Sequence, residues 1–598
     1  MKSLFKYCLI LFLCLQLLAC KNGDVSKTFP NIIFVMTDDQ GYGDLGCNGN
    51  SEIKTPYIDA FASQSLNFTN YHVGTTCSPT RAGLMTARNC LRNGVWHTNA
   101  GCSLLNQDEE TIADVFSSAG YKTAMFGKWH LGDNYSFLPE QRGFQETFYH
   151  KGGGVGQTPD YWGNDYLDDT FFRNGIPEKT LGYCTDVFFD EALLFIEKHK
   201  ETPFFCYLSL NAPHSPFNVP EKYYEIYRYN DNLLESQKRF YGMISNIDDN
   251  FGRLLNHLES LGLTENTIVI FTTDNGTSNG YRYDKKEKKW YGYNAGMRGT
   301  KTSEYDGGHR VPMIMQWKSK GLSSGKLYNG LSAHVDVLPT LSKLANIAYN
   351  PKQSIDGIDL SAYIQNDTEV DRMLVTDTQR NLWPKKGKKS CVMYGNWRLV
   401  NGDELYNMSN DPGQKLNIIK DYPKIAKSMA HFYDIWWEEA SKEFRYSYID
   451  IFPNTTNVLT AHDVYVNSIT AWHQKDIRSG NAYELGNFHI DVKKAGNYEL
   501  ILRRWPNEID LPLNASLNNY TPPSLYWDEV KNGVSMNIIS ANILINDNKP
   551  ITSVEKVKNG IYFNVKLKTG KQTISPSFKL KNGDQTLVYY TEIRYLGG

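Results

Sequence analysis

Two pairs of oxygen-donor side chains stand directly after apolar runs that are typical of buried strands. Asp38 and Asp39 end one run, and Asp274 and Asn275 end another. Carboxylate and amide oxygens, with no histidine or thiolate among them, favour calcium or magnesium over zinc. Taken alone, an Asp-Asp pair after a strand is more often a solvated turn or a helix cap. Two such strand ends in one domain indicate a site for a hard divalent cation.

Basic residues and histidines follow the other apolar runs. Lys128 and His130 stand in the block Gly-Lys-Trp-His-Leu-Gly, His214 in Asn-Ala-Pro-His-Ser-Pro, and Lys301 in Arg-Gly-Thr-Lys. An unperturbed histidine titrates near pH ~6.5, so it can act as acid or base near neutrality. A single histidine or lysine on a loop is usually a surface residue. As a set at strand ends, these four predict a cationic, proton-transferring pocket.

The elements that must position these residues are strands of a parallel sheet. Each strand is an unbroken apolar run, which is typical of a strand buried on both faces. Helical patterns lie between the runs; the clearest has its apolar stripe within residues 240–261. Strands alternating with helices predict an α/β domain whose strands deliver polar residues at their carboxyl ends. The runs are residues 30–37, 121–125, 203–210 and 267–273.

The segment Cys-Ser-Pro-Thr-Arg-Ala-Gly-Leu-Met-Thr-Ala-Arg, residues 77–88, resembles the signature of the type I sulfatases. The Cys-x-Pro-x-Arg core from Cys77 to Arg81 is intact. Thr80 replaces the commoner serine, and Ala87 replaces the commoner glycine. Alone, the pentapeptide is equally compatible with a buried structural cysteine at a helix start. The other blocks, present and in order, make the resemblance specific.

The resemblance implies that a formylglycine-generating enzyme oxidises Cys77 to formylglycine. A hydrated aldehyde offers two hydroxyls, one to attack sulfur and one to expel sulfate as the carbonyl re-forms. The resemblance also implies a calcium ion, with magnesium as the alternative. The implied metal ligands are Asp38, Asp39, Cys77, Asp274 and Asn275.

The same resemblance implies a role for each basic residue in hydrolysis of a sulfate monoester. Arg81 and Lys128 stabilise the formylglycine, and His130 accepts the proton as sulfate leaves. His214 and Lys301 hold the sulfate, and one of them protonates the departing alcohol. Two alternatives stay open: a phosphonate or phosphate monoester hydrolase of the same superfamily, and a catalytically inactive glycan-binding lipoprotein.

Substrate recognition is predicted from residues 160–173, a segment without a clear strand. Its aromatic, carboxylate and amide side chains are those of sugar pockets, although an irregular surface loop fits equally well. The segment resembles that of polysaccharide-degrading sulfatases, which implies a sulfated carbohydrate, with an O4-sulfated galactose or N-acetylgalactosamine residue as our interpretation. The candidate substrate-binding residues are Trp162, Asn164, Asp165, Asp169, Arg173 and His309.

A chain of 598 residues is too long for one ordinary core. We expect an alkaline-phosphatase-like α/β domain with a mainly parallel sheet flanked by helices. A small antiparallel subdomain and an appended β-sandwich should follow it, because the pattern becomes purely β after about residue 450. A formal net charge of −2 gives no global basic field for nucleic acid. The expected boundaries are 1–20 for a leader, 28–375 for the catalytic domain, 376–445 for the subdomain and 450–598 for the sandwich.

The amino terminus has the features of a bacterial lipoprotein signal. Lys2 and Lys6 precede an apolar stretch that is too short to span a bilayer and ends in Leu-Leu-Ala-Cys. Cys20 is then the lipid-carrying first residue of the mature protein, which attaches it to a membrane. Simple cleavage near Ala19 with free release is the alternative. We expect export to the periplasm or the outer-membrane surface of a Gram-negative bacterium.

Overall fold

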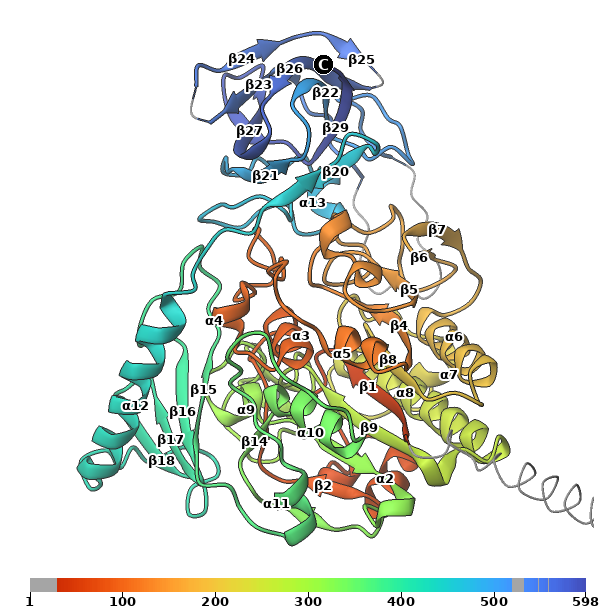
Figure 1. The fold of residues 1–598 in the computed structure, drawn as a ribbon, viewed down its shortest axis with the longest axis vertical. Helices are drawn as coiled ribbons and strands as arrows, with labels where there is room; N and C mark the ends of the chain where they lie inside the picture. Colours follow the sequence, from red (N-terminus) through yellow and green to blue (C-terminus); the bar gives the residue numbers. More distant parts are fainter. Residues whose placement is uncertain (1–28, 519–531, 547, 558) are drawn as a thin grey trace, which may run out of the picture.

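The computed structural model describes residues 29–518, 532–546, 548–557 and 559–598, so the predicted leader and Cys20 lie outside it. Figure 1 shows a large helix-flanked sheet, a smaller antiparallel sheet beside it and a separate β domain at one end. In the described ranges, no helix is long and apolar enough to cross a membrane. The seven cysteines in those ranges are all free thiols.

The central sheet has ten strands, and its middle is built from the four apolar runs predicted from the sequence. They lie next to one another in the order β9, β1, β8, β4, and all their pairings are parallel. Every residue of β1, β8 and β9 is buried, as expected of strands covered on both faces. The predicted α/β fold class is confirmed. These strands are β1 (Asn31–Thr37), β4 (Lys122–Lys128), β8 (Phe204–Ser209) and β9 (Thr267–Thr273).

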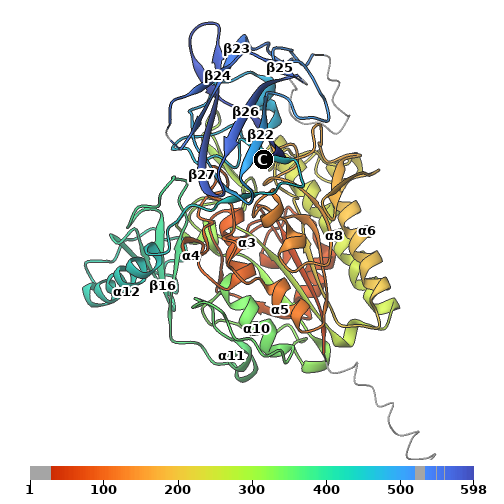
Figure 2. The same cartoon turned by 45° about the horizontal axis from the view of Figure 1, so that its top comes forward.

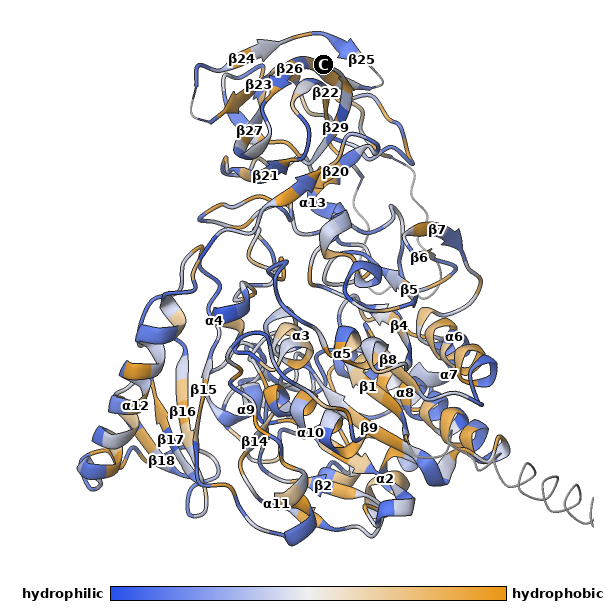
Figure 3. Cartoon of the chain, in the orientation of Figure 1, coloured by the Kyte–Doolittle hydropathy of each residue, from blue (hydrophilic) through white to orange (hydrophobic). Residues whose placement is uncertain are grey.

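Alternate side chains of each central strand enter two separate cores, one on each face of the sheet. On β1, Ile33 and Val35 pack in one core, and Ile32, Phe34 and Met36 in the other. The apolar stripe predicted within residues 240–261 faces the first core, and Figure 3 shows the alternation of polar and apolar residues along that helix, α8. The first face carries α6 (Cys184–Lys198) and α8 (Glu235–Ser260); the second carries α3 (Cys77–Thr86), α5 (Ile112–Ser118) and α10 (Val337–Leu344).

A four-stranded antiparallel sheet and one long helix lie beside the central sheet. The buried Arg398 on its third strand donates from Nε to Asp306 at 2.9 Å, which ties the small sheet to the main domain. The elements are β15 (Met373–Asp377), β16 (Ser390–Tyr394), β17 (Trp397–Val400), β18 (Glu404–Asn407) and α12 (Pro423–Ser441).

The carboxyl-terminal β domain is a sandwich of a six-stranded and a five-stranded sheet. On β21 (Phe488–Val492) every second residue is apolar, and Phe488, Ile490 and Val492 enter the sandwich core. The next strand along the chain, β22 (Gly496–Arg503), belongs to the other sheet and pairs there with β26 (Gly560–Leu567) and β29 (Tyr590–Gly597). Figure 2 shows the sandwich seated over the end of the catalytic domain near α3 and α4 (Cys90–Asn93).

Buried histidines make the stability of the domain depend on pH, and His150 at the end of β5 (Glu146–His150) is one that can be tested. Burial lowers the pKa of His150 from 6.5 to about 3. Below about pH 6.5 the unfolded chain therefore binds a proton at His150, whereas the folded chain does not. The contribution of His150 to the unfolding free energy is complete above that pH and is lost as the pH falls below it. We expect the unfolding free energy of the wild type, relative to His150→Gln, to fall by about 2 kcal/mol between pH 7 and pH 5. Chemical denaturation at both pH values measures this difference, and parallel pH curves for the two proteins would contradict it.

Candidate active site

The carboxyl ends of the central strands bring the predicted polar residues to one edge of the sheet. Because β1 lies between β8 and β9, the residues after these three strands are neighbours in space. The backbone N–H of Asp39 donates to Asp274 Oδ1 at 3.1 Å, although the two residues are 235 positions apart. The residues delivered to this edge are Asp38 and Asp39 after β1, Lys128 at the end of β4, His214 after β8, and Asp274 and Asn275 after β9.

Three ion pairs form the centre of this edge, and those of Lys128 and Arg81 are almost completely buried. Each pair joins one basic and one acidic side chain, so the six groups balance in charge. A buried ion pair is tolerated only where its geometry and further hydrogen bonds compensate the loss of hydration. The pairs are Lys128 Nζ with Asp38 Oδ2 at 2.6 Å, Arg81 with Asp274 Oδ2 at 2.7 Å, and Lys301 Nζ with Asp39 Oδ1.

Cys77 is the first residue of α3 and lies buried among these charges. Its Sγ is 3.7 Å from Lys301 Nζ. Burial raises the pKa of the Cys77 thiol, so the unmodified side chain is a poor nucleophile near neutral pH. The amino end of a ten-residue helix favours an anion at this position. The location therefore suits a group that handles an anionic substrate better than it suits a reactive thiolate.

The same edge fits a divalent cation. The ligand atoms of Asp38, Asp39 and Cys77 all lie within 4.8 Å of one another. Asp38 Oδ1 and Asn275 Oδ1 are buried and accept no hydrogen bond from any described residue. The Asn275 amide donates from Nδ2 to Asp39 Oδ1 at 2.9 Å, which leaves its carbonyl oxygen for another partner. Such a set of hard oxygen donors suits calcium or magnesium.

Two histidines present a ring nitrogen that carries no proton. His214 Nδ1 lies 2.7 Å from the carbonyl oxygen of Ser215, so Nδ1 carries the ring proton and donates it. His214 Nε2, which lies 3.8 Å from Asp39 Oδ2, therefore carries no proton. His130 Nε2 likewise lies 2.7 Å from the carbonyl oxygen of Thr98, and His130 Nδ1 is buried without a partner among the described residues. Burial lowers the pKa of His214 to about 3 and that of His130 well below its usual range. Both rings are therefore neutral, and each has one ring nitrogen without a proton.

A family model described as Sulfatase matches residues 30–347, which is more than half of the chain and includes every residue of this cluster. The chain belongs to the sulfatase family. It is a sulfuric ester hydrolase, and the cluster at the edge of the central sheet is its candidate active site.

Similar proteins support the assignment. The sulfatase is 30% identical over 366 residues to N-acetylgalactosamine-6-sulfatase from Mus musculus, covering 57% of this chain and 68% of that protein. It is also 30% identical over 392 residues to the ulvan-active sulfatase of Formosa agariphila, covering 60% of this chain and 70% of that one. The solved structure of Ps i-CgsB with k-i-k-neocarrahexaose matches with a TM-score of 0.61 and 26% identity, over 70% of this chain and 95% of that chain.

The residues predicted to bind substrate have other partners in the sulfatase. Trp162 packs edge-on against Trp505 of the sandwich, with ring centroids 5.3 Å apart. His309 is fully buried against His72, and the partly exposed Arg173 forms ion pairs with Glu178 and Glu191.

The remaining three hold the loop of residues 160–170 together. Asn164 donates to Asp160 and to the carbonyl oxygen of Thr170, and Asp169 accepts from the backbone of Asp165 and Tyr166. Asp165 is also buried. Substrate contact by any of these six residues stays a prediction.

A glycine-rich loop that the sequence reasoning overlooked touches the histidines of the sulfatase. A Cβ at Gly153 would lie 2.2 Å from His130 Cε1, and a Cβ at Gly154 would lie 3.2 Å from His214 Cε1. The signal was the run Gly-Gly-Gly-Val-Gly, which begins at Gly152 shortly after β5, since repeated glycines often mark a close approach of backbone to another group. The loop is therefore part of the wall that fixes both rings.

The sandwich holds this glycine loop in place. The backbone of Thr158 donates to Trp472 at 3.1 Å, and the backbone of Gln474 donates to Gly156 at 3.0 Å. The buried Gln474 side chain then donates to Gln157 at 3.1 Å and accepts from Gly163 at 2.9 Å. The sandwich thus supports the active site through the backbone of the loop.

Gly153→Ala tests this wall. The added methyl group would displace the His130 ring, and misplacement by about 1 Å can lower kcat by roughly a hundredfold. We expect that loss in sulfate release, with an unchanged circular dichroism spectrum. Gly163→Ala is the matched control on the neighbouring loop of residues 160–170, because a Cβ there meets nothing within 4 Å. The control has strain from its positive φ, so it should lower stability and leave kcat within about twofold; equal kcat losses in both variants would contradict the role of Gly153.

Proposed function

We propose that this sulfatase hydrolyses a sulfate monoester of a carbohydrate, using a formylglycine formed from Cys77 and a calcium ion. The observation that carries the proposal is the position of Cys77. It stands at the buried amino end of α3, beside Lys301 and within 4.8 Å of the Asp38 and Asp39 ligand atoms. A structural cysteine needs none of these neighbours.

The charges of the site support an anionic substrate. Three basic and three acidic side chains cancel one another, so a bound divalent cation gives the cluster a net positive charge. A sulfate monoester is an anion and is attracted to that charge in a site shielded from water. Arg81 and Lys128, both buried, hold their positive charges beside the group at position 77, which the family resemblance implies they stabilise.

Hydrated formylglycine supplies two hydroxyls, one to attack sulfur and one whose loss of a proton re-forms the carbonyl and releases sulfate. The chain supplies the proton transfers around these events. His130 has an unprotonated Nδ1 and accepts a proton there as sulfate is released.

Lys301 is the better donor to the departing alcohol. Burial alone would lower its pKa, but the adjacent acidic groups, Asp39 first, outweigh burial and raise it, so Lys301 is protonated. His214 is neutral by contrast, because burial lowers its pKa to about 3. We therefore assign proton donation to Lys301.

Calcium would be held by Asp38, Asp39, Asp274, Asn275 and the group at position 77. The cation would supply Lewis-acid chemistry that polarises the sulfate ester. The unpartnered Asp38 Oδ1 and Asn275 Oδ1 support this ligand set. The family resemblance favours calcium over magnesium.

Asp38→Asn tests the cation. The substitution keeps the shape of the side chain and removes a charged ligand, so we expect calcium affinity to fall by roughly tenfold or more and sulfate release to fall with it. Titration calorimetry with calcium measures the first effect. Asp44→Asn is the control: Asp44 is equally buried but is not one of the proposed ligands, and burial raises its pKa to about 7, so a neutral side chain is tolerated there. Unchanged calcium affinity in Asp38→Asn would remove Asp38 from the ligand set.

The substrate class is proposed from relatives whose names specify sulfated sugars. We propose a glycan-derived sugar of galactose or N-acetylgalactosamine type, since N-acetylgalactosamine-6-sulfatase and the complex of Ps i-CgsB with k-i-k-neocarrahexaose are among the similar proteins. We also propose that the protein is exported and lipid-anchored through Cys20, which the leader pattern supports.

A phosphonate monoester hydrolase is the rival from the same superfamily. The solved structure of such an enzyme from Agrobacterium radiobacter has a TM-score of 0.50 and 18% identity with this chain, a likeness of fold only. Hydrolysis of phenyl phosphonate with little sulfate release would favour the rival.

Cys77→Ala tests the nucleophile. Protein co-expressed with a formylglycine-generating enzyme should release sulfate from at least one member of a panel of singly sulfated galactose and N-acetylgalactosamine derivatives. In Cys77→Ala the rate should fall below about one thousandth of the wild type with the fold intact, because the nucleophile is gone. The exposed free thiol Cys47 provides the control variant Cys47→Ala, which should keep full activity. Normal turnover by Cys77→Ala would sink the formylglycine mechanism.

A further inference from the structure

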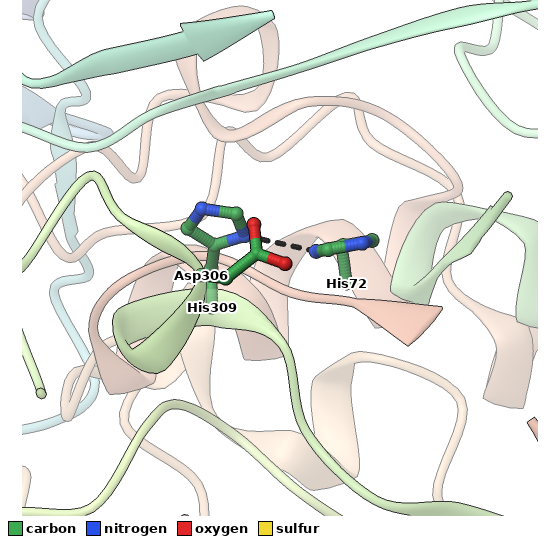
Figure 4. Close-up of side chains that lie close together, drawn as sticks. All are labelled: His72, Asp306 and His309. Carbon is green, nitrogen blue, oxygen red and sulfur yellow. Dashed lines mark hydrogen bonds between the residues drawn. The ribbon is translucent and has the colours of Figure 1, made fainter. Parts of the chain in front are cut away.

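Two buried histidines and an aspartate meet behind the active site, where nothing in the proposed sulfatase mechanism requires them (Figure 4). His72 ends β3 (Tyr71–His72), and Asp306 and His309 are the first and last residues of α9 (Asp306–His309). The two Nδ1 atoms are 2.9 Å apart, and all three ligand atoms lie within 4.8 Å of one another. None of the three residues is more than 1% exposed.

The outer atoms of the histidines have the partners that metal-bound imidazoles usually have. His72 Nε2 lies 2.9 Å from Asn70 Oδ1, and His309 Nε2 lies 3.2 Å from the carbonyl oxygen of Glu304. Both partners are acceptors, so each Nε2 carries the ring proton. The two Nδ1 lone pairs then face each other, which is unfavourable unless a cation binds both of them.

The aspartate is arranged in the same way. Arg398 donates from Nε to Asp306 Oδ1 at 2.9 Å, and both side chains are 1% exposed. Asp306 Oδ2 is buried and has no hydrogen-bond partner among the described residues. One carboxylate oxygen is therefore fixed by Arg398, and the other remains available beside the two imidazoles.

We propose that His72 Nδ1, His309 Nδ1 and Asp306 Oδ2 bind a second metal ion, of the zinc class. Two imidazole nitrogens and one carboxylate oxygen are a donor set for zinc and related divalent ions, whereas the active-site oxygens suit calcium. Three protein ligands with a fourth from water is a coordination that zinc adopts.

Such an ion would stiffen the support of the active site. The backbone of Val73 donates to His309 at 2.8 Å, and that of Gly276, next to Asn275, donates to Gly308 at 2.9 Å. An ion bound by His72 and by both ends of α9 would fix β3 to the turn beneath Asn275. Its role is structural, and the existence of the site does not depend on the proposed substrate.

One competing arrangement needs no metal. One terminal nitrogen of Arg398 also lies 3.2 Å from His72 Nε2. If His72 Nε2 accepts a hydrogen bond from Arg398, the ring proton of His72 is on Nδ1, and His72 Nδ1 donates to His309 Nδ1. The experiment must separate a shared proton from a shared metal.

Zinc binding in the presence of saturating calcium separates them. Full-length protein is incubated with zinc, passed through a desalting column and measured by metal mass spectrometry. We expect one zinc per chain in the wild type, and a zinc content at least about tenfold lower in His309→Ala. Asp38→Asn, which alters the active-site ligands, should keep its zinc. Absence of zinc in the wild type, or zinc lost in Asp38→Asn and kept in His309→Ala, would overturn the proposal.

A crystallographic measurement covers the case in which His309→Ala does not fold. Wild-type crystals grown with zinc are measured on both sides of the zinc absorption edge. We expect an anomalous peak between His72 and His309. A map with no peak there, whether or not zinc occupies the Cys77 cluster, would assign the pair to a shared proton.

Discussion

The structure of this sulfatase depends on the compensated burial of charge at one edge of its central sheet. Lys128 with Asp38 and Arg81 with Asp274 are almost fully shielded from water. Loss of one partner from such a pair commonly costs about 3–5 kcal/mol, because the other charge stays buried and alone. These pairs form only if the strand order, the start of α3 and the loop of Lys301 bring the partners within contact distance. The features that bind an anion therefore also constrain the fold.

The parts that support this edge come from distant places in the chain. The glycine loop after β5 limits the positions of His130 and His214, and the sandwich fixes that loop through Gln474. The sandwich is therefore more than an appended module, because its removal would free the backbone that confines the histidines. On the opposite side, α9 connects the small antiparallel sheet to the turn beneath Asn275 through Asp306 and Arg398.

The central strands, their faces and the gathering of Asp38, Lys128 and Asp274 could be predicted from the sequence. Strands that are buried on both faces can be recognised in a sequence as unbroken apolar runs, and parallel strands bring the residues at their carboxyl ends to one edge of the sheet. The contacts of Trp162 with Trp505 could not be predicted, since they join residues more than 300 positions apart and no local pattern encodes them. The pair of His72 and His309 is invisible for the same reason, because only the folded chain brings its two members within 2.9 Å.

The fate of solvent oxygen during turnover tests the proposed mechanism most directly. In the proposed mechanism the nucleophile at position 77 attacks sulfur. Hydrolysis of a sugar sulfate in ¹⁸O-labelled water should therefore break the bond between sulfur and the sugar oxygen. Mass spectrometry of the products should then find label in the released sulfate and none in the sugar hydroxyl. Label in the sugar hydroxyl would mean that the carbon–oxygen bond breaks, and it would contradict nucleophilic attack on sulfur from the amino end of α3.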